Sequence, residues 1–360
     1  MLYKLKDIFD LQMGKTPSRN NIEYWNTNDY KWVSIADLTK TDKYIYDTKE
    51  YLSKKAVNES GIKIIPANTV IMSFKLSIGK TAITAEDMYS NEAIMAFHDK
   101  HIVEILPEYI FYLFKYKNWD DGSNKAVMGK TLNKAILSEV EIDICSIEEQ
   151  RKIVNVLDKI MNLISARKKE LSYLDTFTKA RFVEMFGNPE ANEKEWKMNT
   201  FGDICTVRQG LQIPISKRLT QYEDDCYEYI TVQYLHGGKE REYIKSPKTS
   251  VICTQNDILM TRTGNTGMVV TGVDGVFHNN FFLIDFDRNK YDKDFLVQYL
   301  KLDIIQADIL RRAGTSTIPD LNHSDFYKIK IFEPPIELQK QFTELITQVD
   351  KSKLQKFSAA

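Results

Sequence analysis

The sequence lacks any long apolar run. No stretch approaches the roughly 20 consecutive apolar residues that a membrane-spanning helix needs. The opening segment, MLYKLKDIFDLQMGK, carries charges at Lys4, Lys6, Asp7 and Asp10, so it has no apolar signal-peptide core. We therefore expect a globular cytoplasmic protein that has no membrane among its partners.

Cysteine pairs and closely spaced metal ligands are also missing. The four cysteines, Cys145, Cys205, Cys226 and Cys253, lie far apart and form no C-x-x-C pair. The five histidines form no H-x-x-x-H pattern. These spacings favour reduced, mostly buried thiols over a disulfide framework, and they predict no metal site.

The chain has no excess of positive charge. Lysine and arginine total 49 residues against 50 aspartates and glutamates, so the formal net charge is −1. A basic stripe is the usual electrostatic footprint of a nucleic-acid-binding domain. If this chain binds DNA, its basic residues must act locally, or a partner must supply much of the phosphate contact.

What the chain does contain is an internal repeat. Its 360 residues, 43% of them hydrophobic, are enough for two or three domains with packed cores. Six segments recur in the same order roughly 190 residues later, which is too long a period for a solenoid. The pairs are LKDIFDLQMG (5–14) with FGDICTVRQG (201–210), YKWVSIADL (30–38) with YEYITVQYL (227–235), NTVIMSFKLSIGK (68–80) with NDILMTRTGNTGM (256–268), EYIFYLFK (108–115) with DFLVQYLK (294–301), SEVEIDI (138–144) with DFYKIKI (325–331), and IEEQRKIV (147–154) with IELQKQFT (336–343). Such an order predicts two copies of one module, although duplication alone fits a two-lobed protein of any function.

Hydrophobic patterns within the repeat predict that each lobe is α+β. Alternating apolar residues predict strands near 32–36, 69–74 and 139–144, with counterparts near 229–233, 257–262 and 326–331. The segments 108–115 and 294–301 are amphipathic with acidic first turns, so we expect them to be helices.

Long helices are expected between and after the lobes. Residues 148–186 contain no glycine or proline, and Gly187 and Pro189 are typical stop signals. Roughly 38 helical residues would span about 55 Å. Apolar residues at coiled-coil spacing form a seam interrupted by Arg167, and they are the expected partner-helix residues: Ile153, Leu157, Ile160, Ile164, Leu171 and Leu174 in the central helix, and Leu338, Phe342, Leu345 and Val349 in the distal one.

These patterns together predict the organisation of the domains. We expect two duplicated α+β lobes, joined by long helices that pair as an antiparallel coiled coil with pseudo-two-fold symmetry. The expected boundaries are a first lobe at 1–146, a central helical spacer at 147–187, a linker at 188–198, a second lobe at 199–335 and a short distal helix at 336–360.

This arrangement resembles the specificity subunit of type I restriction-modification systems. The residues that carry the resemblance are KLKDIFDLQMGKTPS, SIEEQRKIVNVLDKI, ARFVEMFGNP, NDILMTRTGNTG and PPIELQKQFTELITQVDKSK, and the match covers essentially the whole chain. The resemblance implies that each lobe is a target recognition domain for one half of a bipartite double-stranded DNA site. It implies helices that set the spacing and dock two methyltransferase subunits, with restriction/translocase subunits joining the assembly. One departure is the distal helix, which is shorter than the central helix, whereas the two are closer in length in the family.

Catalytic motifs are incomplete. The phrases IGKT (78–81) and GKT (129–131) lack the earlier glycine of a phosphate-binding loop, because Phe74 and Asn124 stand there. EPPI (333–336) does not match a methyltransferase motif, and Glu195-Trp196-Lys197 supplies only part of a nuclease motif. We therefore expect a non-catalytic subunit without a cofactor, and S-adenosylmethionine, ATP and Mg²⁺ on its partners. A fused methyltransferase or endonuclease and a coiled-coil scaffold that binds no nucleic acid stay open as alternatives.

Basic and small polar residues cluster in a few segments of each lobe. Arginine can donate two hydrogen bonds to guanine, asparagine can read adenine, and glycines allow close approach of the backbone. Any single cluster could equally be a solvated turn, since exposed lysine and arginine are common. The candidate DNA-binding residues are Lys15, Arg19, Lys75, Ser77, Lys80 and Lys130 in the first lobe, and Arg208, Gln209, Gln212, Lys217, Arg218, Arg262, Thr263, Asn265, Arg311 and Arg312 in the second.

Overall fold

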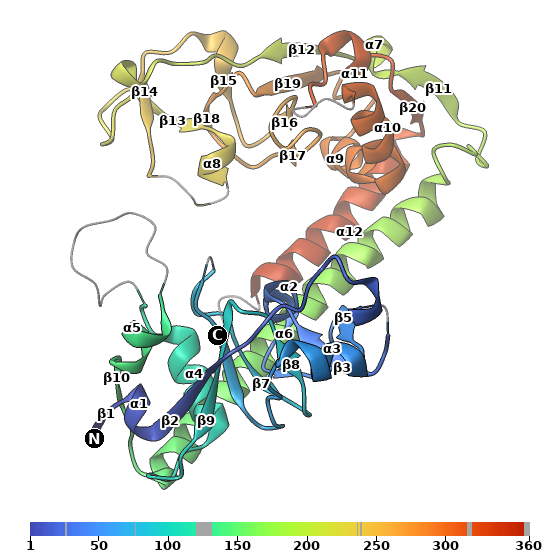
Figure 1. The fold of residues 1–360 in the computed structure, drawn as a ribbon. Coiled ribbons are helices and arrows are strands. Elements are labelled where there is room, and N and C mark those ends of the chain that lie inside the picture. The colour runs from blue at the N-terminus through green and yellow to red at the C-terminus, as the bar shows by residue number, and fades with distance from the viewer. Residues whose placement is uncertain are drawn as a thin grey trace. The chain divides into compact units, whose positions relative to one another are not determined.

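The computed structural model describes most of the chain (Figure 1). The described residues are 1–355 without Asn26, Leu76, 120–131, 236, 238–239 and 315–318, and side chains are described as far as Ser352. The chain divides into two compact units, Met1–Ala166 and Arg167–Ala360. Among the described residues, no helix has the length and apolar character needed to cross a membrane.

The first unit is built on three sheets (Figure 1). The largest has the order β2-β9-β6-β7-β4, a second has the order β5-β3-β8, and β1 pairs with β10. The strands are β1 (Leu2–Lys4), β2 (Phe9–Met13), β3 (Tyr30–Val33), β4 (Tyr44–Ile45), β5 (Glu50–Leu52), β6 (Val70–Ser73), β7 (Thr81–Thr84), β8 (Tyr89–Ser90), β9 (Ile94–Asp99) and β10 (Glu141–Asp143). The helices are α1 (Leu5–Ile8), α2 (Ile35–Lys40), α3 (Lys54–Ser60), α4 (Pro107–Tyr116) and α5 (Lys134–Ser138), with a 3-10 turn η1 at Ile22–Tyr24.

The second unit repeats this plan. Its sheets have the orders β12-β19-β16-β17, β14-β13-β18-β15 and β11-β20. The strands are β11 (Lys197–Thr200), β12 (Cys205–Gln209), β13 (Cys226–Ile230), β14 (Tyr243–Lys245), β15 (Ile252–Cys253), β16 (Ile258–Thr261), β17 (Val269–Val270), β18 (Gly275–Phe277), β19 (Phe281–Phe286) and β20 (Lys330–Glu333). The helices are α7 (Phe201–Ile204), α8 (Val232–Leu235), α9 (Lys293–Lys301), α10 (Asp303–Ala313), α11 (His323–Phe326) and α12 (Ile336–Gln355), with 3-10 turns η2 (Ile215–Lys217) and η3 (Thr249–Val251).

Among the described residues, the two units share most of their strand pairing, although the β4–β7 pair occurs only in the first unit and the β15–β18 pair only in the second. The order β2-β9-β6-β7 in the first corresponds to β12-β19-β16-β17 in the second, and all of these pairs are antiparallel. The parallel pairing of β3 with β8 corresponds to that of β13 with β18. The predicted α+β class, with one module present twice, is confirmed.

Some of the predicted strands end earlier or begin later than expected. The strand expected at 32–36 ends at Val33, because the Ser34 side chain accepts a hydrogen bond from the Asp37 amide and starts α2. Its counterpart likewise ends at Ile230, before α8 begins at Val232. The strand expected at 326–331 begins only at Lys330, because α11, capped by Asn322, takes up the residues just before it. In each case a side-chain cap or a short turn outweighs the alternating pattern.

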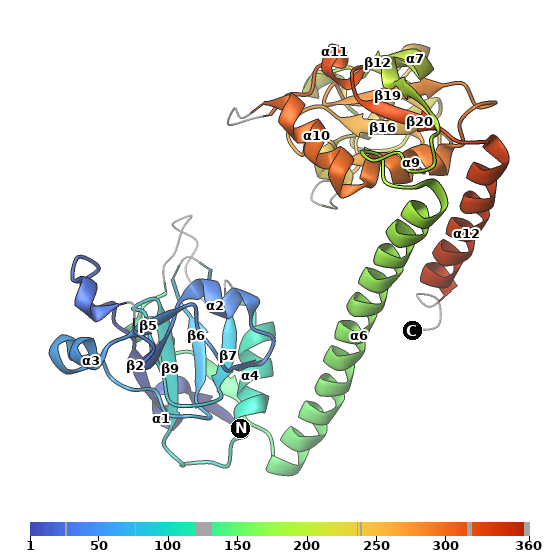
Figure 2. The same ribbon diagram turned by 90° about the vertical axis from the view of Figure 1, so that its right-hand side faces the viewer.

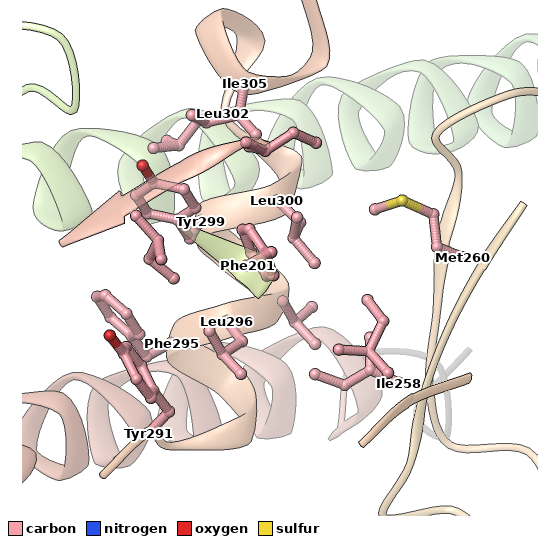
Figure 3. Packing of buried hydrophobic residues seen from close by; sticks show 14 of the residues in the cluster. Phe201, Ile258, Met260, Tyr291, Phe295, Leu296, Tyr299, Leu300, Leu302 and Ile305 are labelled. Atoms are coloured by element: carbon pink, nitrogen blue, oxygen red, sulfur yellow. The ribbon is translucent and has the colours of Figure 1, made fainter. Parts of the chain in front are cut away.

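The core of the second unit is rich in aromatic side chains (Figure 3). In α9, Tyr299 packs against Phe201 with ring centroids 6.4 Å apart, Phe295 packs against Phe332 at 6.1 Å, and all four rings are fully buried. The Tyr299 hydroxyl donates a hydrogen bond of 2.8 Å to the Lys330 carbonyl, so the one polar atom of that ring is satisfied. This core fixes α9 against the β12-β19-β16-β17 sheet, which carries the candidate loop described below.

The central helix α6 runs without interruption from Ile147 to Phe186. Its final turns belong to the second unit, where Phe182 and Phe186 are fully buried. Both rings pack against Phe342 near the start of α12, with centroids 5.3 and 5.4 Å away. The end of α6 therefore meets the start of α12, and Figure 2 shows the two helices side by side and antiparallel within this unit.

The expected seam of α6 does not face a single neighbour. Ile153 and Leu157 pack against the core of the first lobe, which includes residues of α4. Ile160 and Ile164 are exposed, while Leu171 and Leu174 are half-buried. In α12, Phe342 and Val349 are buried, and Leu338 and Leu345 pack against the core of the second unit. A helical period shows which residues share a face, whereas the surrounding fold decides what that face meets.

Candidate nucleic-acid interface

A tight loop follows β16 in the second lobe. The Thr261 hydroxyl donates to the Asn265 carbonyl and accepts from the Met268 amide at 2.9 Å. The Gly267 amide donates to the Thr261 carbonyl at 2.9 Å, and Gly267 has a φ of 88°. Glycine suits this left-handed conformation because it has no β-carbon. The hydroxyl thus closes residues 261–268 into a compact loop, called here the second clamped loop.

The first lobe contains the same device after β6. The Ser73 hydroxyl donates to the Ser77 carbonyl and accepts from the Lys80 amide at 3.1 Å. The Gly79 amide donates to the Ser73 carbonyl at 3.0 Å, and Gly79 has a φ of 87°. Residues 73–80, of which all but Leu76 are described, therefore contain the first clamped loop, and each lobe has a loop of this kind at the same place in its sheet.

In the second clamped loop, the Arg262 guanidinium is held by Asp320. Arg262 Nε and Nη2 donate to the two carboxylate oxygens of Asp320 at 2.9 and 2.8 Å. Arg262 Nη1 makes a longer contact of 3.4 Å with Gln209 Oε1. The hydrogen bond with Asp320 raises the pKa of Arg262, which stays positively charged. The structure thus brings together two of the predicted DNA-binding residues, Arg262 and Gln209.

Segment 319–321 and β19 hold this loop in place. The Leu321 amide donates to the Arg262 carbonyl at 3.0 Å, and the Thr266 hydroxyl donates to the Pro319 carbonyl at 2.8 Å. The Arg262 amide donates to the carbonyl of Asn280 at 2.8 Å. Because the backbone on both sides of Arg262 is fixed, the position of its side chain is largely set before any ligand arrives.

A histidine and an asparagine lie at the same edge of the lobe. His323 packs edge-on against Phe282, with centroids 5.4 Å apart. Burial, followed by the positive charge of Arg262, lowers the pKa of His323, so its ring is neutral near pH 7. Asn279 Oδ1 is buried and has no hydrogen-bond partner among the described residues.

Arg218 must be withdrawn from the candidate DNA contacts. Its guanidinium donates twice to the Ile213 carbonyl, at 2.9 and 2.6 Å, and pairs with Glu242 at 3.0 Å. It also lies 5.0 Å from the centre of the Tyr229 ring, and its side chain is only 12% exposed. Because its side chain is largely covered and these bonds all lie within the lobe, Arg218 supports the β13-β14 region instead of facing a ligand.

The remaining candidates of the second lobe are spread over its surface. Arg208 donates to the Ser250 carbonyl at 3.1 Å, and both Arg311 and Arg312 pair with Asp308. Gln212, Lys217 and Asn265 are exposed, and Thr263 is half-buried. None of these residues is hydrogen-bonded to Arg262 in the described part of the chain.

The first-lobe candidates are also engaged locally. Arg19 lies 3.9 Å from the centre of the Trp25 ring and 4.9 Å from that of Trp32, and it pairs with Glu50. Lys15 donates to the Ser60 carbonyl, and Lys80 donates to the Thr39 hydroxyl at 2.5 Å. Lys75 lies over the Phe74 ring at 5.3 Å, Ser77 closes the first clamped loop through its carbonyl, and Lys130 falls outside the described residues.

Sequence reasoning missed two side chains that shape the second clamped loop. Asp320 lies 58 residues from Arg262 in the chain. Gln306 of α10 donates to the Gly267 carbonyl at 2.9 Å and to the Leu300 carbonyl at 2.6 Å. No local pattern marks either residue, because both act through contacts that only the folded lobe creates.

No metal centre is evident in the part of the chain that the structure describes. Within it, no group of three or more histidine, cysteine, aspartate or glutamate side chains is placed to hold an ion. The polar groups of the second clamped loop are instead donors and acceptors suited to hydrogen bonding with a base edge or a phosphate.

Relatives and solved structures match along nearly the whole chain. The MjaIX type I restriction enzyme specificity subunit of Methanocaldococcus jannaschii is 26% identical, over 95% of this chain and 85% of the relative. The EcoprrI specificity subunit of Escherichia coli is 22% identical, over 96% and 86%. The crystal structure of a type I restriction-modification S subunit from M. genitalium has the same fold, with a TM-score of 0.56 at 16% identity and coverage of 100% of this chain and 91% of that one.

A family model covers both lobes, α12 and the larger part of α6. The model of the type I restriction modification DNA specificity domain matches twice, at residues 1–173 and 193–357. The two matches correspond to the two copies of the module seen in the sheets and in the clamped loops. With nearly every residue included in one match or the other, this chain belongs to the type I restriction-modification DNA specificity family.

Proposed function

We propose that this chain gives a type I restriction-modification complex its DNA specificity, each lobe reading one half of a bipartite double-stranded site. The observation that carries the proposal is the pair of clamped loops, residues 73–80 and 261–268, which occupy the same place in the two lobes. Two copies of one reading module suit a site made of two separate parts. The loops differ in side chains, so the two half-sites should differ in sequence.

The long helices are the proposed docking surface for two methyltransferase subunits. Val156, Ile160, Leu163 and Ile164 of α6 are exposed, and their spacing places them on one face of the helix. Exposed apolar side chains gathered in this way are typical of a protein interface. In the described part of the chain, α12 (Ile336–Gln355) is the proposed docking helix for the second methyltransferase subunit. Restriction/translocase subunits would join this assembly.

Catalysis and cofactor binding are proposed for the partners. S-adenosylmethionine and Mg²⁺-ATP would be bound by the methyltransferase and restriction/translocase subunits, while this chain contributes no catalytic group. The cytoplasm, where the chromosome lies, is the proposed location. A fused methyltransferase or endonuclease is not favoured, since relatives matched over most of the chain are specificity subunits.

Partner-dependent DNA binding and methylation test the proposal. The chain should be expressed with and without its cognate methyltransferase subunits, and chromosomal methylation mapped by single-molecule sequencing. We expect methylation at a bipartite site only when all subunits are present. We also expect weak DNA binding by the chain alone, because a net charge of −1 releases few counterions. Equal DNA affinity with and without the partners would count against the proposal, and no modification by the complete complex would favour the non-DNA scaffold.

A further inference from the structure

The Arg262–Asp320 pair leaves a defined set of donors free. A guanidinium carries five N–H groups, one on Nε and two on each terminal nitrogen. Asp320 accepts from Nε and Nη2, and Gln209 accepts from Nη1. In the part of the chain that the structure describes, this leaves one N–H on Nη1 and one on Nη2 without a partner. The Arg262 side chain is 28% exposed, so part of it is open to solvent.

The fold of the clamped loop does not require this pair. In the first clamped loop, Phe74 stands where the second has Arg262, and its backbone amide makes the corresponding bond. The Phe74 amide donates to the Ala93 carbonyl at 3.0 Å, as the Arg262 amide does to that of Asn280 at 2.8 Å. The hydroxyl clamp is likewise present in both loops.

The partner residue is replaced as well. Buried Leu132 and the helix cap Asn133 correspond to buried Leu321 and the cap Asn322, so Thr131 stands in the sequence where the second lobe has Asp320. Arginine and aspartate therefore occur together in one lobe and are both missing from the other. A charge pair that the shared fold does not need is available for a function specific to the second half-site.

A stabilising role alone would be a weak reason for the pair. Asp320 is 47% exposed, and ion pairs this open to water contribute little to stability. A role as a plain phosphate clamp also fits poorly, because the Asp320 carboxylate already contacts the guanidinium and would repel a phosphate. A base edge carries no net charge, so it can approach without that repulsion.

We infer that Asp320 is a positioning residue that presents the free Nη1 and Nη2 donors of Arg262 to a guanine in the major groove. Guanine offers two adjacent acceptors there, O6 and N7, which match two parallel N–H donors. Asp320 restricts rotation of the guanidinium, so that less conformational entropy is lost when the base binds. The carboxylate also lowers affinity for phosphates at unrelated sequences. This inference rests on the proposed function and names one side chain that sets the sequence of the second half-site.

Methylation mapping of an Asp320→Asn variant tests the inference. The full chain would be expressed with its cognate methyltransferase subunits, and the wild-type map would first establish the bipartite site. Asp320→Asn keeps the shape of the side chain and removes its charge. Arg262→Phe with Asp320→Thr copies the residues of the first lobe, which folds the same loop without the pair. Glu223→Gln is the matched control, because it removes an exposed carboxylate paired with Lys245 in the same lobe.

The expected result is relaxation at one guanine of one half-site. In Asp320→Asn, discrimination at that base pair should fall about tenfold or more, the order of one lost bidentate contact. The double variant should relax the same base pair, and Glu223→Gln should keep the wild-type site. Binding of the Asp320→Asn complex to unrelated duplex DNA should become tighter.

Several results would overturn the inference while leaving the proposed function intact. They are an unchanged methylation site in Asp320→Asn, relaxation at a base pair other than a guanine, relaxation in different half-sites for the two variants, and uniform loss of methylation at all sites. Failure of the wild-type complex to methylate DNA would instead remove the proposed function itself, so the two failures are distinguishable.

Discussion

Gln150 and Gln339 make the same three hydrogen bonds in the two units. Gln150 Nε2 donates to the Glu104 and Cys145 carbonyls, both at 2.9 Å, and Oε1 accepts from the Leu106 amide at 2.9 Å. Gln339 Nε2 donates to the Lys290 and Pro334 carbonyls at 3.0 and 2.8 Å, and Oε1 accepts from the Asp292 amide at 2.8 Å. Both side chains are fully buried. The duplicated module therefore includes the joint between each lobe and the helix that leaves it.

Replacing either glutamine by methionine should destabilise its own unit. Gln339→Met keeps a similar volume but leaves two carbonyls and one amide without partners, and we expect the free energy of unfolding to fall by about 2–3 kcal/mol. Chemical denaturation followed by circular dichroism measures the change. Gln348→Met, at an exposed position of the same helix, is the control and should have little effect. Equal stability of Gln339→Met and Gln348→Met would mean that the hydrogen bonds of Gln339 contribute nothing to the free energy of unfolding.

Gly267→Ala should cost more stability than Gly272→Ala. Both glycines have a positive φ, 88° and 77°, so both substitutions introduce backbone strain of about 1 kcal/mol or more. A β-carbon at Gly267 would also lie 2.9 Å from Gln306 Oε1 and 3.0 Å from an Ile309 methyl, whereas at Gly272 it would meet open space. We expect a difference of about 1–2 kcal/mol between the two variants in thermal or chemical unfolding. Equal stability of the two variants would show that the second clamped loop shifts to accommodate the added β-carbon at no measurable cost.

Arg262→Ala should weaken DNA binding by the assembled complex at one half-site only. The expected loss is roughly 1–3 kcal/mol if the side chain reads a base. Competition binding with duplexes that carry each half-site singly mutated measures it. Arg311→Ala offers a comparison, since that arginine is paired with Asp308 and is not hydrogen-bonded to the clamped loop. A loss of the same size on every duplex would make Arg262 a phosphate contact, and an unchanged affinity would exclude the loop from the interface.

An insertion in α6 should change the spacer of the DNA site. The helix is continuous across the boundary between the two units at Ala166 and Arg167. Seven residues added after Ala166 keep the heptad face and lengthen the helix by about 10 Å. At 3.4 Å per base pair this corresponds to roughly three base pairs, together with a rotation of over a quarter turn.

Two outcomes of the insertion would agree with a central helix that sets the distance between the two half-sites. Either methylation mapping finds a longer spacer, or modification is lost because the rotated lobe no longer meets its half-site. The two half-site sequences should stay the same in the first case. An unchanged spacer with full methylation would contradict a spacing role for α6. Altered half-site sequences would show that the helix itself reads bases.

Much of this protein could be predicted from its sequence alone. The six collinear segments predicted two α+β modules, and the uninterrupted stretch before Gly187 predicted a central helix whose observed bounds are Ile147–Phe186. These features follow from local rules, because side-chain periodicity and the placement of glycine and proline act over a few residues. The glutamines of IEEQ and IELQ were part of the same repeat, although their hydrogen bonds were not foreseen.

The tertiary structure alone decided which side chains face outward and which meet each other. Arg218 and Arg262 look alike in the sequence, yet Arg218 is largely covered and pairs with Glu242, whereas Arg262 is more exposed and pairs with Asp320. Ile153 and Ile160 share one helical pattern, yet the first packs on a lobe and the second is exposed. The physical reason is that these outcomes depend on neighbours many residues away. Local periodicity carries no information about such neighbours, so hydrogen-bond partners and burial are settled only when the sheets close around them.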